Sequence, residues 1–159
     1  MNETTELLSK SRLGAELTKD EANKLANLME LRELKSGEQL IVEGTVDDSL
    51  HVILQGNVEV AKRTAGGGIA NIAVIRAGNL AGELSFIDGE VHTVGLSTLS
   101  DTKVLSLSRT DFEKLITTDP LLVYKVMRAV TRSAHRIMHQ MNAEYIELNN
   151  YIFKQHGRY

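Results

Sequence analysis

Hydrophobic and polar residues follow a helical pattern over the last quarter of the chain. Apolar side chains recur at three- and four-residue steps from Leu121 to Phe153, which is the spacing of one helix face. Asp119 is suited to cap such a helix, and Pro120 is suited to its first position. We therefore predict one amphipathic helix of roughly 30 residues, about 45 Å long at 1.5 Å per residue.

Helical patterns also occur at three other places. The segment Thr18–Glu21 has the capping-box pattern, so we expect a helix from about Thr18 to about Glu30. A shorter helix is expected before it, over about Thr5–Leu13, and another over Asp111–Ile116.

The middle of the chain has the texture of a β structure. Short apolar runs, several of them alternating with polar residues, are separated by glycine at regular intervals. The expected strands are Gln39–Val42, Leu50–Leu54, Asn57–Ala61, Ile69–Ile75, His92–Leu99 and Lys103–Leu107. Gln55-Gly56 indicates a tight hairpin turn, and Thr64–Gly68 a mobile hairpin tip. This regular punctuation predicts a barrel or a sandwich.

Composition narrows the classes of function. The formal net charge is −3, so no overall positive field favours binding to nucleic acid or to an anionic membrane. The absence of cysteine excludes disulfides, thiolate nucleophiles and cysteine-ligated metals. No segment has the pattern of a signal peptide or a membrane-spanning helix, so we expect a cytoplasmic protein without a membrane partner. We find no nucleophile triad, P-loop or paired carboxylates, and expect no enzymatic activity.

The segment Gly78–Gly89, GNLAGELSFIDG, resembles the phosphate-binding cassette of cyclic nucleotide-binding domains. Upstream, residues 35–38, 41–44 and 50–60 resemble the glycine-marked turns and strands of that family, in the same order. The family includes catabolite activator proteins and protein kinase A regulatory subunits, and the resemblance spans roughly residues 13–142. It implies an α+β fold in which a double-stranded β-helix, or jelly-roll-like β-roll, carries N-terminal helices and a long C-terminal helix.

The chain has the size and apolar content of one globular domain, with 159 residues of which 42% are hydrophobic. We therefore expect a single domain over residues 1–159. Its N-terminal helices are expected at about 3–30, its β-roll at about 31–108 and its C-terminal helices at about 109–153.

The resemblance implies a site for cyclic AMP or cyclic GMP at the cassette, with no cofactor required. In the family a short helix begins there and directs its backbone N–H groups, here those of Glu83, Leu84 and Ser85, at the cyclic phosphate. Gly82 allows close backbone approach. The Glu83 carboxylate is expected to accept a hydrogen bond from the ribose 2′-hydroxyl. The structural alternative is a carboxylate that stabilises the N-terminus of its own helix.

The chain departs from the family where members that bind cyclic nucleotides have arginine followed by two small residues. His92, Thr93 and Val94 occupy these positions. Imidazole titrates near pH ~6.5 and offers one N–H, whereas guanidinium is a permanent cation that binds phosphate in two places. We expect binding about ten- to hundredfold weaker than with arginine. Thr93 keeps a hydroxyl for the phosphate, and Val94 narrows the pocket.

The long helix also contacts the nucleotide in this family. Counting from Pro120 without gaps places that contact zone at about Ile137–Met141. Only Gln140 and Asn142 are polar candidates for reading the base, so the choice between adenine and guanine stays open.

A helix this long projects beyond a small β-roll, so its apolar face is expected to pair with a second copy in a homodimer. The alternative is that it folds back on its own domain. The expected seam consists of Val130, Ala134, Ile137, Met138, Met141, Tyr145 and Leu148. Because the sequence ends at Tyr159, we expect no DNA-binding helix-turn-helix domain after it and a separate, unknown effector protein.

Two other patterns on the long helix have ordinary explanations. His135 and His139 are spaced to share a metal ion, but no third ligand is near, so no metal site is expected. The basic stripe, which consists of Lys125, Arg128, Arg132 and Arg136, is expected to be a solvated face. The alternative is contact with an acidic partner or nucleic acid.

Together these patterns predict a non-enzymatic sensor module. It binds a cyclic nucleotide weakly and signals through its dimerisation helix to a separate protein. The alternative is a dimerising interaction module of the same fold that has lost nucleotide binding or binds a different small anion.

Overall fold

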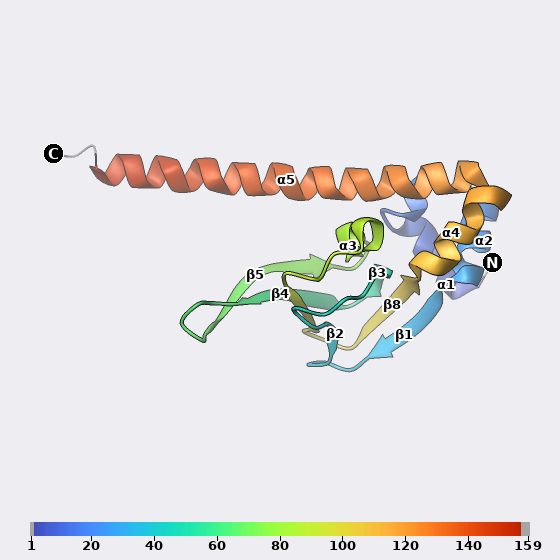
Figure 1. The fold of residues 1–159 in the computed structure, drawn as a ribbon, viewed down its shortest axis with the longest axis horizontal. Coiled ribbons are helices and arrows are strands. Elements are labelled where there is room, and N and C mark those ends of the chain that lie inside the picture. The colour runs from blue at the N-terminus through green and yellow to red at the C-terminus, as the bar shows by residue number, and fades with distance from the viewer. Residues whose placement is uncertain (1, 157–159) are drawn as a thin grey trace.

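The computed structural model describes residues 2–156, which form a β-roll flanked by helices (Figure 1). The N-terminal part consists of α1 (Glu3–Lys10), the 3₁₀ turn η1 (Gly14–Glu16) and α2 (Lys19–Leu28). The Thr18 side chain accepts a hydrogen bond from the Glu21 backbone N–H at 3.2 Å, which confirms the predicted helix cap. Both expected N-terminal helices are present, and each ends earlier than predicted.

In the described part of the chain, eight strands form two antiparallel sheets of four strands each. The first sheet has the order β1-β8-β3-β6, and the second has the order β2-β7-β4-β5. The strands are β1 (Glu30–Leu34), β2 (Gln39–Ile41), β3 (Leu50–Gln55), β4 (Asn57–Arg63), β5 (Ile69–Arg76), β6 (Leu80–Ala81), β7 (Gly95–Thr98) and β8 (Thr102–Leu107). Strands far apart in sequence, such as β1 and β8, are neighbours in space. The two sheets with their helices are the predicted α+β β-roll.

The connection between β3 and β4 corrects the predicted hairpin at Gln55-Gly56. β3 pairs with β6 and β8, whereas β4 pairs with β5 and β7. Gly56, with a φ of 88°, is therefore a corner at which the chain passes from one sheet to the other. A Cβ atom at this position would lie 2.5 Å from Thr102 Oγ1, so a larger residue does not fit.

The hydrophobic pattern does not predict two of the strands, β1 and β6. Leu34 is the only buried residue of β1, so no apolar alternation marks that strand. The strand expected from His92 begins only at Gly95, because the preceding residues connect it to the cassette. The segment Thr64–Gly68 does join β4 to β5, as predicted.

The core consists of two hydrophobic clusters. The larger one packs one face of the first sheet against the helices, and its members include Leu50, Val52, Leu105, Leu107, Leu13, Leu25, Phe86, Leu122 and Val126. The smaller one lies inside the β-roll and includes Ile41, Ile53, Val58, Leu96 and Val104. The larger cluster thus fixes the helices to the sheet that holds the cassette.

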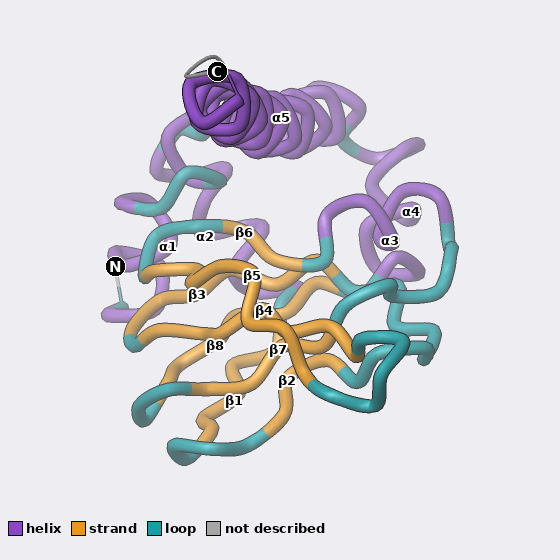
Figure 2. The backbone as a smooth tube through the Cα atoms, turned by 90° about the vertical axis from the view of Figure 1, so that its left-hand side faces the viewer, coloured by secondary structure: helices purple, strands orange, loops and turns teal. Residues whose placement is uncertain are grey.

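Two helices follow the β-roll, α4 (Arg109–Thr118) and α5 (Pro120–His156). α5 has 37 residues and confirms the predicted long helix. It runs along the molecule above α3 (Glu83–Asp88), and its C-terminal half extends well past α3 (Figure 1). Viewed down its axis, α5 lies above the sheets, with α1 and α2 on one side and α3 and α4 on the other (Figure 2). Within residues 2–156, no helix combines the length and apolar character needed to span a bilayer.

Ion pairs attach the first half of α5 to the N-terminal helices. Lys125 Nζ lies 2.6 Å from Glu21 Oε1, and Arg128 Nε lies 3.4 Å from Glu16 Oε2. Arg132 also pairs with Glu16. Arg128 and Arg132 are exposed, as expected for a solvated face, but Lys125, Arg128 and Arg132 also form ion pairs within the chain.

Candidate ligand-binding site

The cassette is a tight strand-to-helix turn. β6 ends at Ala81, and Gly82 adopts a left-handed conformation with φ 72° immediately before α3. A Cβ atom on Gly82 would lie 3.1 Å from the Ser49 carbonyl oxygen, so the turn is close-packed as well as left-handed. The backbone N–H groups of Glu83, Leu84 and Ser85 form the first turn of α3, the arrangement that the resemblance implies.

Glu83 is buried at the junction of the cassette and α5. Glu83 is 5% exposed, and the Ser133 hydroxyl of α5 donates a hydrogen bond to Glu83 Oε1 at 3.3 Å. Burial raises the pKa of Glu83 above its usual value, although its own backbone N–H, Ser133 and the charge of Arg136 oppose the shift. The carboxylate is thus placed as an acceptor, and the Ser133 hydroxyl of the long helix donates to it.

His92 is also buried, and both of its ring nitrogens have partners. Nε2 lies 2.7 Å from the Asp47 carbonyl oxygen, which only accepts, so Nε2 carries a proton. Nδ1 lies 3.2 Å from Ser85 Oγ, and in the neutral ring it accepts the hydroxyl proton. The imidazole N–H is therefore directed at a backbone carbonyl in this state, and its binding of phosphate stays a prediction.

Asp47 and His51 support the histidine from the neighbouring strand and loop. The Asp47 carboxylate accepts a hydrogen bond from His51 Nε2 at 2.9 Å, and His51 Nδ1 lies 2.7 Å from Ser106 Oγ. Burial alone would raise the pKa of Asp47, but the hydrogen bonds and charge of His51, with help from Ser49, lower it to about 2. This network holds the Asp47 carbonyl against His92.

The remaining predicted ligand residues are less enclosed. Leu84 is 62% exposed, so only its backbone N–H belongs to the cassette. Thr93 is exposed, and its carbonyl oxygen accepts a hydrogen bond from Lys62 Nζ at 2.8 Å. Val94 is half-buried beside it. The seven predicted residues, which are Gly82, Glu83, Leu84, Ser85, His92, Thr93 and Val94, thus lie on α3 and the segment that leads to β7.

α5 meets the cassette one turn earlier than the predicted zone of Ile137–Met141. The contact is made by Ser133, and Ile137 and Met141 are exposed. The zone Ile137–Met141, which was predicted to contact the nucleotide, lies about one turn beyond this contact and stays a prediction. Neither Ser133 nor Asp47 carries a local sequence signal, because each meets its partner through tertiary packing.

Residues expected in the dimer seam fall into two groups. Val130 is buried in the core of its own chain, and Ala134 is half-buried. The others are exposed, namely Ile137, Met138, Met141, Tyr145 and Leu148. The His135 and His139 rings lie 5.7 Å apart, and no group of three metal-binding side chains occurs in the part of the chain that the structure describes.

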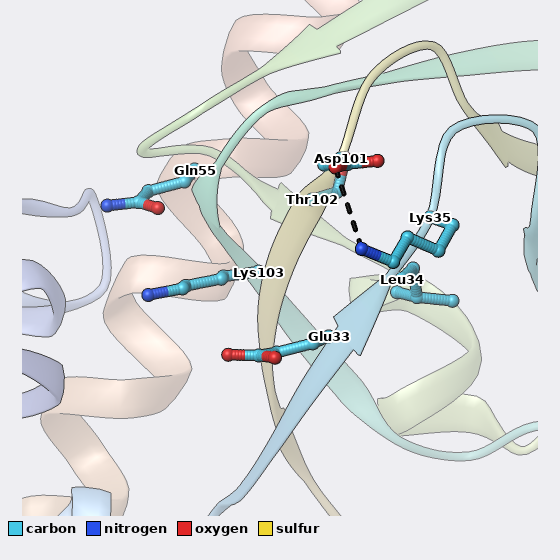
Figure 3. Close-up of a pocket in the computed structure, with 7 residues that line it drawn as sticks. All are labelled: Glu33, Leu34, Lys35, Gln55, Asp101, Thr102 and Lys103. Atoms are coloured by element: carbon cyan, nitrogen blue, oxygen red, sulfur yellow. Dashed lines mark ion pairs between the residues drawn. The ribbon is translucent and has the colours of Figure 1, made fainter.

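A polar hollow of about 230 Å³ lies elsewhere on the β-roll (Figure 3). Its lining comes from β1, β3 and β8 and the turns beside them, namely Glu33, Leu34, Lys35, Gln55, Asp101, Thr102 and Lys103. The figure shows Lys35 and Asp101 facing each other across it, with Nζ 3.8 Å from Oδ2. No cassette residue lines this hollow, so it contributes nothing to the site described above.

Comparison with known proteins agrees with the site geometry. A family model described as "Cyclic nucleotide-binding domain" matches residues 31–119, which is more than half of the chain. A cGMP-dependent protein kinase of Caenorhabditis briggsae is 32% identical over 111 residues, which make up 69% of this chain and 15% of the kinase. The chain also spans 54% of a cyclic AMP receptor protein of Thermus thermophilus, so it matches only part of each of these relatives.

Solved structures show the same fold. A cyclic nucleotide-binding domain from Methylobacillus flagellatus is 28% identical, with a TM-score of 0.70 over 96% of this chain and 82% of that one. The Thermus thermophilus catabolite activator protein has a TM-score of 0.70 at 23% identity, over 90% of this chain and 64% of that one. With the matched family model and the left-handed glycine before α3, these similarities establish that the chain belongs to the cyclic nucleotide-binding domain family.

Proposed function

We propose that this protein is a non-enzymatic, cytoplasmic sensor module that binds cyclic AMP or cyclic GMP at the cassette. The observation that carries the proposal is the turn at Gly82, where a left-handed glycine precedes a short helix and a buried Glu83. Free N–H groups at a helix N-terminus bind phosphate, and a buried carboxylate accepts a hydrogen bond from a ribose hydroxyl. Membership of the family supports the same ligand class.

The affinity is expected to be weak because of His92. Its N–H is directed at the Asp47 carbonyl oxygen, and turning it toward a phosphate would leave that buried carbonyl without this partner. A guanidinium would supply further donors without giving up such a bond. The neutral ring also lacks the permanent charge that strengthens a bond to phosphate.

A homodimer through the distal part of α5 is the second part of the proposal. Residues seven apart lie on the same side of a helix, so the side that begins at Ser133 continues with Gln140 and Glu147. That side faces the chain's own cassette and becomes polar. The next side, about 100° around the helix, carries Ala134, Met141 and Leu148. Leu148 follows Val130, which is buried in the chain's own core, by 18 residues or five full turns, so this stripe continues the core-facing side of α5. Its distal residues are exposed, and an exposed apolar stripe is suited to a second copy.

Ser133 offers a route from the ligand to the helix. It donates to the Glu83 carboxylate that the ribose hydroxyl is expected to use, so ligand and α5 compete for one acceptor. Binding would therefore release or shift α5 at this point, and the shift reaches the distal half because the helix is continuous. An effector protein outside this chain would read the change.

Calorimetric titration with cyclic AMP and cyclic GMP at pH 6 and pH 8 tests the ligand. We expect saturable heat with at least one nucleotide at high micromolar to millimolar concentration. His92→Arg should bind about ten- to hundredfold more tightly, because it adds a permanent bidentate cation. Glu83→Gln is the matched loss variant. Absence of heat with both nucleotides at millimolar concentration would refute the ligand assignment.

The alternative function is an interaction module of the same fold that has lost nucleotide binding or takes a different small anion. The internal partners of both His92 ring nitrogens favour it, because a site that satisfies its own polar groups needs no ligand. In that case neither nucleotide binds, while the dimer persists. The titration above separates the two functions.

A further inference from the structure

In the basic stripe of α5, Arg136 is the residue whose charge is not paired with a carboxylate of the N-terminal helices. Lys125 pairs with Glu21, and Arg128 and Arg132 share Glu16. Arg136, one turn further along, forms no salt bridge within the described part of the chain. It is nevertheless half-buried, so its cationic head is partly removed from water.

Arg136 is located beside the cassette. Ser133 is in direct contact with Glu83, and Arg136 follows three residues later on the adjoining helix surface. From the N-terminal segment, Arg12 is attached next to the same place, since its backbone N–H donates to the Gly78 carbonyl oxygen at 2.9 Å. Gly78 begins the cassette sequence, so cationic residues from two elements meet at its edge.

Charges at this position do not balance. Burial lowers the pKa of Arg136 below its usual value, and the charges of Arg12 and Arg132 lower it further, while only Glu83 opposes them. Glu83 itself has a raised pKa and is poorly suited to compensate a cation. Arg132 already shares Glu16 with Arg128. A half-buried guanidinium among like charges is stabilised by an anion from outside the chain.

We propose that Arg136, with Arg12 beside it, binds the phosphate of the ligand held at the cassette, in place of the arginine that His92 replaces. This assignment rests on the proposed function for its ligand, because the cassette supplies the amides and α5 supplies the cation. A guanidinium binds phosphate through two parallel N–H bonds, which imidazole does not offer. The cation would thus come from α5, so phosphate binding and the position of this helix are coupled directly.

A substitution that removes the positive charge of Arg136 and keeps a polar side chain distinguishes this residue from its basic neighbours. The variant is Arg136→Gln, and the matched control is Arg63→Gln at the end of β4, beside the β4–β5 turn. The probes are cyclic AMP, cyclic GMP and inorganic pyrophosphate. Binding of each probe to the full chain is measured by calorimetry and by the shift in the thermal unfolding midpoint.

Arg136→Gln should weaken nucleotide binding about ten- to hundredfold and abolish any rise in the unfolding midpoint caused by pyrophosphate. Arg63→Gln should match the wild type in both. Without ligand, Arg136→Gln should unfold at the same temperature as the wild type or higher, because it removes repulsion from Arg12 and Arg132. This last result distinguishes a ligand cation from a structural partner of Glu83.

Two results overturn the inference. One is nucleotide and pyrophosphate binding by Arg136→Gln at wild-type affinity. The other is a lower midpoint in ligand-free Arg136→Gln with unchanged binding, which makes the arginine structural. If the wild type responds to pyrophosphate through Arg136 but binds neither nucleotide, the proposed ligand fails while the anion site stands. A wild type that responds to no probe overturns both.

Discussion

The two halves of α5 differ in what they bury. In the first half, Leu122, Val126 and Ala129 are at most 2% exposed and pack in the chain's own core. In the second half, large apolar side chains from Ile137 to Phe153 are 43–72% exposed. A contiguous exposed apolar surface of this kind marks an interaction site. The same continuous helix thus stabilises one chain at its beginning and presents an interface at its end.

The boundary between the halves coincides with the cassette contact. Ser133 is the last buried residue among the residues of α5 whose burial is described, and it donates to Glu83. Beyond it, Ile137 and Leu148 continue the side of the helix that carries the buried Val126 and Val130, but they are exposed. One side of the helix is therefore buried in the chain's own core up to Ser133 and exposed after it, with the candidate ligand site at the boundary.

The largest expected effect comes from the buried half. Leu122→Ala should lower the free energy of unfolding by about 2–5 kcal/mol, because it leaves a cavity in the core. The matched control is Leu121→Ala, where the side chain is 59% exposed and a change within about 0.5 kcal/mol is expected. Denaturant unfolding followed by circular dichroism measures both. Equal effects at the two positions would contradict the anchoring of the first half.

Substitutions in the exposed half of α5 should change the affinity of the dimer rather than the stability of the fold. Met141→Glu places a charge in the expected seam and should weaken the dimer on the order of a hundredfold. Gln140→Glu places the same charge on the neighbouring polar side and should leave the dimer intact. Light scattering across a dilution series reports the mass of each. If Met141→Glu stays dimeric at the concentrations at which the wild type is dimeric, Met141 is not part of the dimer interface.

A smaller, pH-dependent effect is expected at the junction. The pKa of Glu83 is raised in the folded chain above its ordinary value of 4.5, so the folded state binds the proton more tightly. The stability that this carboxyl contributes is complete below about pH 4.5 and is lost as pH rises through its folded-state pKa. Glu83→Gln, which stays neutral, should therefore gain stability relative to the wild type at pH 7 and show no such gain at pH 4. Thermal unfolding at both values checks the sign, and a gain at pH 4 alone would contradict it.

Residue spacing and turn glycines in the sequence predict those helices and turns whose conformation is set by neighbouring residues. Helical spacing marks α5, and the glycine before Glu83 marks the left-handed turn that begins α3. The Gln55-Gly56 prediction was wrong because a positive φ suits a hairpin and a corner equally, and strand pairing decides between them. Strand pairing is a long-range property.

The supporting residues of the site were beyond prediction for the same reason. His51 is a polar residue within the expected strand Leu50–Leu54, and it is 1% exposed. Its partners Asp47 and Ser106 come from a loop and from β8. Arg136 has the spacing of a solvated stripe, and only the fold brings it to the cassette.

The most direct test measures the distal half of α5 while the cassette is titrated. Because the chain has no cysteine, Asn142→Cys provides a single site for a spin label. Pulsed dipolar spectroscopy should give one short intermolecular distance, because the axes of paired helices are about 8–10 Å apart. That distance should change when cyclic AMP or cyclic GMP saturates the protein. No intermolecular signal, or one distance unaltered by both nucleotides, would contradict a dimerisation helix governed by the cassette.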